Sequence, residues 1–546
     1  MKESPDRFRF IEKSILFLAP FFIGLLALTQ GQDVNWDLLN YHYYTGYAFW
    51  TGSWQKDMMP AGIQSLLEPL YNIFIYLLIH NLPPIAVGFI LGTLDGLAFI
   101  FLFLIAGLFI DKRIERASYR LAFKILVALS GLYVPNFLSQ LGNTNGDILT
   151  GLFVLSGLTI VLHRMGDESS SGWIWGGLLM GMGVGLKLTN GVYVLGMAIA
   201  VALSMGINKT NLKRLISFLS GSGAGFAVTG GYWFFKLYQR FGDPFFPYYN
   251  SLFHSPYGLS ADSHDYRWFP SSVTEWIFFP FYFTKQHQIA ELSIENYSFM
   301  FIYVLIVLVF LKLVFSRVFP VEHIKGDSDK IVPLDEKLFL IFFVASFILW
   351  EVTFSYYRYL SPLEGLAPIL IFILLRYFLV RGAVIVTLSL LLFNAVNPHY
   401  PEWGRIPWGK SYFQMEGIKK GLPKEALVLV GAKPLAFVIP ELPEGFRYFT
   451  IGNLGGIASP LWSEKIHVRV QKSQEPLYLL TDKDALSVNQ KSLNAFGVKI
   501  DRSSCISLKN RARVGIRLCR LKKIPNLEGK RINPPLKDKM MSLFQR

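Results

Sequence analysis

Long apolar blocks alternate with short polar segments through the first 396 residues of the chain. A helix needs about 20 apolar residues to cross a bilayer. We therefore predict eleven membrane-spanning helices, several with approximate ends because their apolar blocks are short. The predicted spans are 14–30, 84–110, 121–139, 148–163, 173–186, 190–206, 214–235, 299–316, 338–355, 362–379 and 383–396. This pattern predicts an all-α polytopic membrane bundle for residues 1–396.

The charge of the connecting segments predicts which side each one faces. Lys and Arg concentrate in cytoplasmic loops. The basic segments are 2–13, 111–120, 163–170, 208–215, 317–337 and 376–382. With these inside, loops 31–83 and 236–298 lie outside, and both are poor in Lys and Arg for their length. The apolar run 66–80 is interpreted as an interfacial helix, because a span there would move segment 111–120 outside. An odd number of spans also places residues 397–546 outside.

Residues 397–546 follow a different pattern, in which short apolar runs are separated by Gly, Pro and charged residues. The runs with strand character are 426–431, 435–440, 448–452, 477–482, 497–500 and 515–519. We predict a small α/β domain outside the membrane. This segment has 26 Lys and Arg against 12 Asp and Glu, so it carries +14 of the net charge of +15. Such a surface is either simply solvated or attracts anionic lipid headgroups and phosphorylated glycolipids.

The only two cysteines, Cys505 and Cys519, lie in this basic domain and flank a predicted hairpin. An oxidising compartment would let them pair as a disulfide, and two buried thiols are the alternative. A disulfide would agree with an outside location, whereas the basic charge of the domain favours the cytoplasm.

Composition supports the membrane class. Hydrophobic residues make up 52% of the chain and charged residues 17%, against about 25% charged in soluble proteins. The sequence has no P-loop, no dinucleotide-binding glycine motif, no soluble nucleotide-sugar domain and no Cys/His metal cluster. Chemistry driven by nucleotide hydrolysis is therefore not expected, and neither is a nucleic-acid partner.

The first external loop begins QDVNWDLLNYHYYTGYAFWTGSW (32–54) and carries two acids among many Tyr and Trp residues. A carboxylate at a membrane interface is costly unless it is paired or functional. Asp33 is the better candidate for capping a helix. We predict an amphipathic helix over Asn35–Trp50, with Asp37 at its start and Tyr41 on its apolar face.

Asp37, Tyr41, Gly52 and Trp54 give the spacing D-x3-Y-x10-G-x-W, followed by a Pro-containing segment and the interfacial helix. This loop resembles the first external loop of the GT-C glycosyltransferases. The likeness is greatest to the branch that holds protein O-mannosyltransferases and the lipid A aminoarabinose transferase. The family commonly has Glu directly after the Asp, where this chain has Leu38. This departure weakens the tie to the mannosyltransferases more than the tie to the superfamily.

Later positions agree with the same resemblance, in order and on one predicted side. Asp147 stands at the outer start of a helix, where the family tends to carry a second acid. Lys187 follows a Gly-rich helix, and Arg358 and Tyr359 open a segment of the form R-Y-x-x-P. The loop 236–298 resembles the large external loop that covers such active sites.

The resemblance implies a glycosyltransferase that moves a hexose or pentose, with inversion, from a polyprenyl-phosphate donor. The acceptor would be a glycolipid, a surface polysaccharide or a protein hydroxyl at the outer face of the bacterial inner membrane. Asp37 is assigned as the general base, and Lys187, Arg267 and Arg358 are candidates for stabilising the phosphate leaving group. Asp147 would orient the acceptor, or bind a divalent ion such as Mg²⁺ or Mn²⁺ together with Asp37. No spacing in the sequence requires a metal.

The candidate substrate-binding set also includes Asp33, Tyr41, His42, Trp54 and Tyr359. Aromatic side chains stack on sugar rings, although they equally anchor a loop at the membrane interface. Three other classes of protein stay open: a ligase that moves a whole glycan from polyprenyl pyrophosphate, a transporter of lipid-linked saccharides, and a non-catalytic assembly factor whose soluble domain does the binding. The transporter is disfavoured because the acids cluster at outer helix ends and no inverted repeat is evident.

Overall fold

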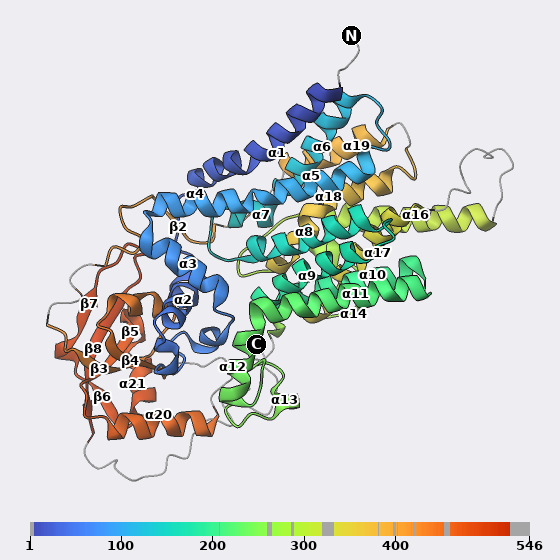
Figure 1. The fold of residues 1–546 in the computed structure, drawn as a ribbon. Helices are drawn as coiled ribbons and strands as arrows, with labels where there is room; N and C mark the ends of the chain where they lie inside the picture. Colours follow the sequence, from blue (N-terminus) through green and yellow to red (C-terminus); the bar gives the residue numbers. More distant parts are fainter. Residues whose placement is uncertain are drawn as a thin grey trace. The chain divides into compact units, whose positions relative to one another are not determined.

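The computed structural model describes residues 5–206, 208–258, 265–284, 289–318, 332–379, 382–396, 400, 402–415, 418, 421–451 and 459–524 (Figure 1). The chain divides into two compact units. The first unit is Met1–Asp33, Ile85–Tyr232 and Asp265–Pro407, and the second is Val34–Pro84, Trp233–His264 and Trp408–Arg546. The predicted boundary at residue 396 stays a prediction, and each unit is described by itself below.

The first unit is a helical bundle, and each of the eleven predicted apolar segments falls on helices, with only the end of 214–235 reaching into the second unit. The long helices are α1 (Pro5–Ala27), α4 (Pro84–Asp95), α5 (Leu97–Ile110), α6 (Ala117–Leu132), α8 (Asp147–Arg164), α9 (Ser171–Leu186), α10 (Gly191–Met205), α11 (Lys209–Phe226), α16 (Ser298–Val318), α17 (Leu334–Thr353), α18 (Ser361–Leu375) and α19 (Ala383–Val396). Short helices α7 (Pro135–Gln140), α14 (Val273–Ile277) and α15 (Phe279–Tyr282) join them. The predicted helical membrane bundle is thereby confirmed.

Six helical segments of the described residues are long and apolar enough to cross a membrane. They are Asp6–Gln30, Pro84–Ile110, Asp147–Arg164, Leu188–Met205, Ser298–Phe315 and Tyr357–Leu375. The chain is therefore of the multi-pass membrane class, and the count of eleven spans stays a prediction. α3 (Leu70–Asn81) has 12 residues and is one of the shorter apolar helices, and the interpretation of the run 66–80 as an interfacial helix stays a prediction.

α18 lies inside the bundle, because every residue from Pro362 to Leu375 is buried. α1 and α16 instead expose large apolar side chains such as Phe17, Phe22 and Phe310. In lipid these outer faces are solvated by hydrocarbon, so their exposure is expected.

α9 and α11 pack through glycines, and Figure 1 shows them side by side. A Cβ at Gly177 or Gly181 of α9 would lie 2.1 or 2.0 Å from a backbone carbonyl oxygen of α11. Small residues let membrane helices approach closely where no hydrophobic driving force acts between them. The Gly-rich sequence SGWIWGGLLMGMGVGL therefore fixes the helix that ends just before Lys187.

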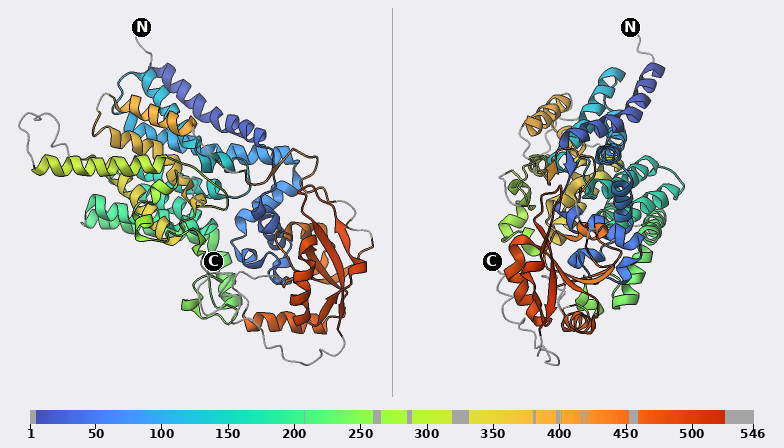
Figure 2. Two further views of the ribbon diagram at one scale, coloured as in Figure 1. Left: turned by 180° about the vertical axis from the view of Figure 1, so that it is seen from behind. Right: turned by 90° about the vertical axis from the view of Figure 1, so that its left-hand side faces the viewer.

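The second unit contains a mixed sheet with strand order β4-β3-β5-β8-β6, in which β7 also pairs with β8 (Figure 2). Its strands are β3 (Glu425–Val430), β4 (Gly445–Thr450), β5 (Leu477–Asp482), β6 (Val498–Ile500), β7 (Ile506–Leu508) and β8 (Ile516–Lys523). β3 runs parallel to β4 and β5, whereas β8 is antiparallel to β5, β6 and β7. With α20 (Pro460–Lys472) and α21 (Leu486–Ala495), this is the predicted α/β domain.

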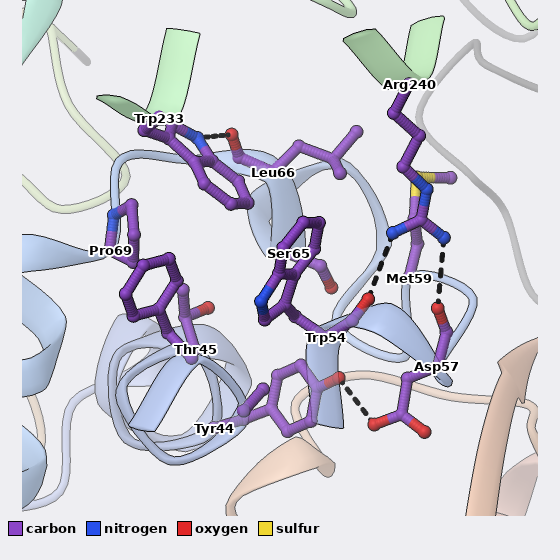
Figure 3. Close-up of a pocket in the computed structure, with 12 residues that line it drawn as sticks. Tyr44, Thr45, Trp54, Asp57, Met59, Ser65, Leu66, Pro69, Trp233 and Arg240 are labelled. Carbon is purple, nitrogen blue, oxygen red and sulfur yellow. Dashed lines mark hydrogen bonds between the residues drawn. The ribbon is translucent and has the colours of Figure 1, made fainter. Parts of the chain in front are cut away.

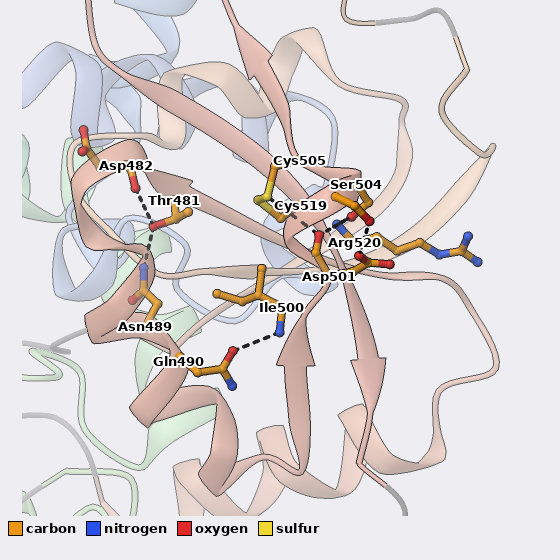
Figure 4. The surroundings of a disulfide bond; sticks show 11 residues. Thr481, Asp482, Asn489, Gln490, Ile500, Asp501, Ser504, Cys505, Cys519 and Arg520 are labelled. Atoms are coloured by element: carbon orange, nitrogen blue, oxygen red, sulfur yellow. Dashed lines mark hydrogen bonds between the residues drawn. A yellow bond between two sulfur atoms is a disulfide. The ribbon is translucent and has the colours of Figure 1, made fainter.

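Two details of this domain differ from or add to the prediction. The prediction of a strand over 435–440 is wrong, because Ala436–Glu441 forms a 3₁₀ helix that contains Pro440. A short apolar run cannot by itself distinguish these two structures. The predicted disulfide between Cys505 and Cys519 is present, next to Ser504 and Arg520 (Figure 4).

The predicted first external loop packs within the second unit as α2 (Tyr43–Trp50), α3 and short helical turns, and it contacts Trp233 and Arg240 of α12 (Tyr232–Phe241). The same unit holds α13 (Asn250–Phe253). The helix predicted over Asn35–Trp50 is present, but the prediction that it is amphipathic is wrong, and its place at the membrane interface stays a prediction. Residues Leu38 through Ala48 are all buried. α3 and the 3₁₀ helix Ala436–Glu441 cover it, so its tyrosines pack against protein.

Candidate functional site

Asp147 lies at the first residue of α8, directly after Gly146. Gly146 has a φ of 77°, which a residue with a side chain rarely adopts. The loop 142–146 that leads into α8 is buried, and so is the Asp147 carboxylate, whose side chain is 3% exposed. The sequence GNTNGD thus turns an acid inward at one end of the bundle.

Two cations from distant parts of the chain meet the Asp147 carboxylate. Lys187 Nζ pairs with Oδ1, and Arg358 places Nε and Nη2 each 3.0 Å from Oδ2. Lys187 comes from the end of α9, and Arg358 comes from the 3₁₀ turn Tyr357–Leu360. The structure thus brings together three of the predicted site residues. We call Asp147, Lys187 and Arg358 the cation cluster.

Aromatic rings surround the two cations. Lys187 Nζ is 5.3 Å from the centre of the Tyr359 ring, and the Arg358 guanidinium is 5.1 Å from that of Trp403. Arg358 Nη1 also lies 3.3 Å from the hydroxyl oxygen of Tyr356. These contacts hold both cations in place and keep part of their surroundings free of water.

A buried carboxylate holds the turn that carries Arg358. Glu364 of α18 accepts hydrogen bonds from Asn296 Nδ2 at 2.7 Å, from the Tyr357 hydroxyl at 2.5 Å and from the backbone N–H of Asn136. Asn136 Nδ2 in turn donates to the carbonyl of Arg358 at 2.9 Å. Arg358 itself pairs with Asp147.

Asp33 has a structural contact in the first unit. It lies in β1 (Gln32–Asp33), which pairs with β2 (Arg405–Ile406). Its Oδ2 accepts hydrogen bonds from the Thr144 N–H at 2.9 Å and from the Thr144 hydroxyl at 2.7 Å. The prediction that Asp33 caps a helix is wrong, because the helix begins at Trp36 and Asn35 accepts the capping hydrogen bond from the Leu38 N–H. Substrate contact by Asp33 stays a prediction.

Asp37 lies in the second unit, half-buried in the first turn of the helix that begins at Trp36. Asn35 caps this helix, since its Oδ1 accepts a hydrogen bond from the Leu38 N–H at 2.8 Å. The turns that follow, Leu38–His42, form a π-helix, a feature found often at functional sites. The predicted general base is therefore on a capped, enclosed helix rather than on an open loop.

The other predicted first-loop residues line the same region of the second unit. Tyr41 and His42 are buried with ring centres 4.1 Å apart, and His42 Nδ1 lies 2.5 Å from Asn72 Oδ1 on α3. His42 thus hydrogen-bonds within the protein, and its contact with substrate stays a prediction. Gly52 has a φ of 74° directly after α2, which explains the glycine of the D-x3-Y-x10-G-x-W spacing as a helix stop.

Trp54 lines a small cavity of about 20 Å³, which has room for about one water molecule (Figure 3). The Trp54 ring lies edge-to-face with Trp233 at 5.5 Å, and Arg240 Nη1 donates to the Trp54 carbonyl at 3.0 Å. Asp57 is beside it and is 4% exposed. Sequence reasoning missed Asp57, Trp233 and Arg240. The one signal that could have found Asp57 is the presence of an acid in the apolar stretch DMMPAG.

Burial raises the pKa of the Asp57 carboxyl. Desolvation raises its pKa from the ordinary 3.8 to about 7, against the opposing hydrogen bonds from Tyr448 and Tyr44 and the charges of Lys56 and Arg240. The folded protein therefore binds this proton more tightly than the unfolded chain. The contribution to the free energy of unfolding is greatest below pH 3.8 and falls as pH rises towards about 7.

We expect Asp57→Asn to remove this dependence. An amide keeps the size of the side chain and does not ionise, so the variant should gain stability relative to the wild type as pH rises. Thermal unfolding of both proteins at pH 5 and pH 8 measures this relative stability. From pH 5 to pH 8, the Tm of the variant should rise by several degrees relative to that of the wild type. An equal difference at both pH values would show that Asp57 ionises with an ordinary pKa.

Arg267 lies in the first unit outside the cation cluster, on an exposed turn. Its Nε and Nη2 bind the Asp265 carboxylate at 2.8 and 2.7 Å, and its guanidinium lies over the Trp268 ring. Phosphate contact by Arg267 stays a prediction, and it would require the Asp265 pair to open.

Asp147 does not fit a cation ligand in this arrangement, because both of its oxygens are paired with Lys187 and Arg358. Among the residues that the structure describes, no group of three or more His, Cys, Asp or Glu side chains could hold a metal ion. Asp37, the other metal ligand considered from the sequence, belongs to the other unit. We derive no step through a metal.

No model of a known protein family matches the chain, and no curated protein matches it. Among solved structures, the chain is similar to the crystal structure of ArnT from Cupriavidus metallidurans bound to undecaprenyl phosphate. The identity is 12%, the alignment covers 94% of this chain and 98% of that one, and the TM-score is 0.48. At this level of similarity the chemistry of ArnT does not transfer, so the function below rests on the residues of this chain.

Proposed function

We propose that this protein is a membrane glycosyltransferase of the GT-C type. It would take a hexose or pentose from a polyprenyl-phosphate donor and transfer it, with inversion, to a glycolipid, surface polysaccharide or protein hydroxyl. The reaction would take place at the outer, periplasmic face of the bacterial inner membrane. The observation that carries the proposal is the cation cluster at one end of the helical bundle.

The charge of the cluster suits a phosphate. One carboxylate and two cations leave a formal charge of +1 on three side chains that are mostly out of water. Lys187 is the most accessible member, with 22% of its side chain exposed against 8% for Arg358. Cations held in a fixed place stabilise a phosphate leaving group without reorganising during the reaction. Asp147 would act here by orienting Lys187 and Arg358.

The apolar bundle suits the lipid part of such a donor. A polyprenyl chain stays in the hydrocarbon, while its phosphate lies at the depth of the helix ends. The cluster is built from the first residue of α8, the end of α9 and the turn directly before α18, all of them at helix ends. A cluster at mid-span would instead favour a transport path.

Asp37 is the proposed general base for the acceptor hydroxyl. The support is its place in the capped first turn of an enclosed helix, where its backbone is fixed and its side chain is half-buried. The sugar and the acceptor are unassigned.

The disulfide in the second unit is typical of an exported domain, which supports the proposed outer location of that unit.

The test is transfer by the purified protein in lipid nanodiscs. Radiolabelled polyprenyl-phosphate sugars of several kinds are supplied together with an extract of envelope glycolipids, polysaccharide and protein as acceptor. Transfer from a polyprenyl monophosphate supports the proposal. Transfer only from a polyprenyl pyrophosphate glycan would identify a ligase, and movement of the lipid-linked sugar across the bilayer without transfer would identify a transporter.

Lys187→Met is expected to raise the KM for the donor about tenfold, because a phosphate contact to a charged partner contributes about 1.5–3 kcal/mol. The fold should survive, since Arg358 still pairs with Asp147. The kinetics of transfer with varied donor concentration measure the effect. Lys213→Met, which removes an exposed lysine of α11, is the matched control and should behave as the wild type. An unchanged donor KM in Lys187→Met would remove Lys187 from the phosphate site.

A further inference from the structure

The first external loop is joined to the C-terminal sheet by backbone pairing. Within the second unit, Met58 forms a parallel bridge with Phe449. The Met58 N–H donates to the Tyr448 carbonyl at 2.8 Å, and the Thr450 N–H donates to the Met58 carbonyl at 3.1 Å. β4 is the edge strand of the sheet, so the loop satisfies backbone groups that an uncovered edge would leave unpaired.

The carboxylate of Asp57 links this edge to the helix that carries Asp37. Its Oδ1 accepts the Tyr448 N–H of β4 at 3.0 Å, and its Oδ2 accepts the Tyr44 hydroxyl of α2 at 2.8 Å. Asp57 and Tyr44 are both buried. One side chain therefore connects two elements that are about 400 residues apart in the sequence, with one oxygen for each.

Arg240 of α12 fixes the same turn from a third direction. It donates from Nη1 to the Trp54 carbonyl at 3.0 Å and from Nη2 to the Asp57 carbonyl at 3.4 Å, while its guanidinium lies near the Trp54 ring (Figure 3). The turn between α2 and the sheet edge is thus held by a helix, a strand and an arginine. A turn that served only as a connection would not need a buried acid, because burying a carboxylate is costly.

From these contacts we propose that the C-terminal sheet positions the proposed base, and that Asp57 is the positioning residue for Asp37. This inference rests on the proposed function. The helix from Trp36 to Trp50 carries Asp37 at its start and Tyr44 two turns later, so fixing Tyr44 fixes the direction of the helix. A displacement of about 1 Å at a reacting group can cost about 100-fold in rate.

The experiment compares four variants of the full-length protein in lipid. Asp57→Ala removes both hydrogen bonds, and Tyr44→Phe removes only the one to the helix. Asp57→Asn keeps the shape and can bond both partners, accepting from the Tyr448 N–H and donating to the Tyr44 hydroxyl. Asp484→Ala changes an exposed acid of the same domain and is the matched control.

We expect kcat to fall about 100-fold in Asp57→Ala and about tenfold in Tyr44→Phe, with the donor KM within twofold of wild type in both. Asp57→Asn and Asp484→Ala should keep kcat within about threefold of wild type. This split separates positioning from a loss of folded protein, which would lower the apparent kcat of every destabilised variant in proportion to its unfolded fraction. A wild-type kcat in folded Asp57→Ala would overturn the inference.

Hydrogen exchange keeps the inference testable if the proposed reaction is wrong. Asp57→Ala should speed amide exchange in residues 36–50 relative to the wild type, and Asp484→Ala should not. If the wild type shows no transfer but Asp57→Ala still speeds amide exchange in residues 36–50, the link between sheet and helix stands. Only the proposed transferase activity is then rejected. Unchanged exchange in Asp57→Ala would reject the positioning role whatever the protein transfers.

Discussion

Replacing Asp37 with Asn is expected to reduce kcat by about 10³-fold, within the range of 10²–10⁴ that a general base contributes. The amide has nearly the same size and cannot accept the proton of the acceptor hydroxyl. Helix formation should persist, because Asn35 rather than Asp37 caps the helix. Initial rates of transfer at saturating donor and acceptor measure the effect, with the donor KM unchanged.

Two carboxylates serve as comparisons for Asp37→Asn. Asp167→Asn alters an exposed acid that pairs with Arg164, and it should transfer as the wild type does. Asp33→Asn probes the other acid near the first loop, whose Oδ2 bonds Thr144. If Asp33→Asn loses transfer at normal stability while Asp37→Asn keeps it, the base has been assigned to the wrong acid.

Asp147→Ala is expected to destabilise the protein by about 3–5 kcal/mol, which is the cost of breaking a buried pair by removing one partner. The change leaves Arg358 buried without its carboxylate, and it also removes the partner of Lys187. Asp147→Asn should cost less, since its oxygen can still accept from one cation. Thermal unfolding in detergent measures both as a lowered Tm.

A double-mutant cycle tests whether the buried charge of Arg358 causes the loss of stability in Asp147→Ala. Arg358→Met combined with Asp147→Ala removes the stranded charge together with the acid, so the double variant should be more stable than the sum of the single changes indicates. Strict additivity would mean that the ion pair contributes nothing and that Asp147→Ala acts through the start of α8 alone. Loss of transfer in every member of this cycle is expected, because each disturbs the proposed phosphate site.

The sequence predicted some parts of the site better than others, for physical reasons. Lys187, Asp147 and Arg358 were found because they stand in short motifs, at the ends of apolar segments, that resemble those of the GT-C glycosyltransferases. Their mutual pairing could not be found, since it depends on how α8, α9 and α18 pack. Glu364 and Asn136 look like ordinary polar residues in the sequence, and only their contacts show that they hold the Arg358 turn.

The first loop shows the opposite case. Its rich content of Tyr and Trp fits both a membrane-interface helix and a buried one, because aromatic residues serve either setting. Periodicity could not distinguish them, since nearly every position from Leu38 to Ala48 is apolar or aromatic. The structure encloses this helix between α3 and elements of the C-terminal domain, which no local pattern encodes.

The sequence by itself determined the membrane class, the helical segments and the α/β domain, because apolar length and alternation are local properties of the chain. It also determined which cysteines could pair, since there are only two. The tertiary structure alone decided that Asp33 bonds the Thr144 loop, that Asp147 holds two cations, and that Asp57 connects α2 with β4. Each of these depends on contacts between residues far apart in the chain, and such contacts arise only when buried polar groups must find partners in the folded protein.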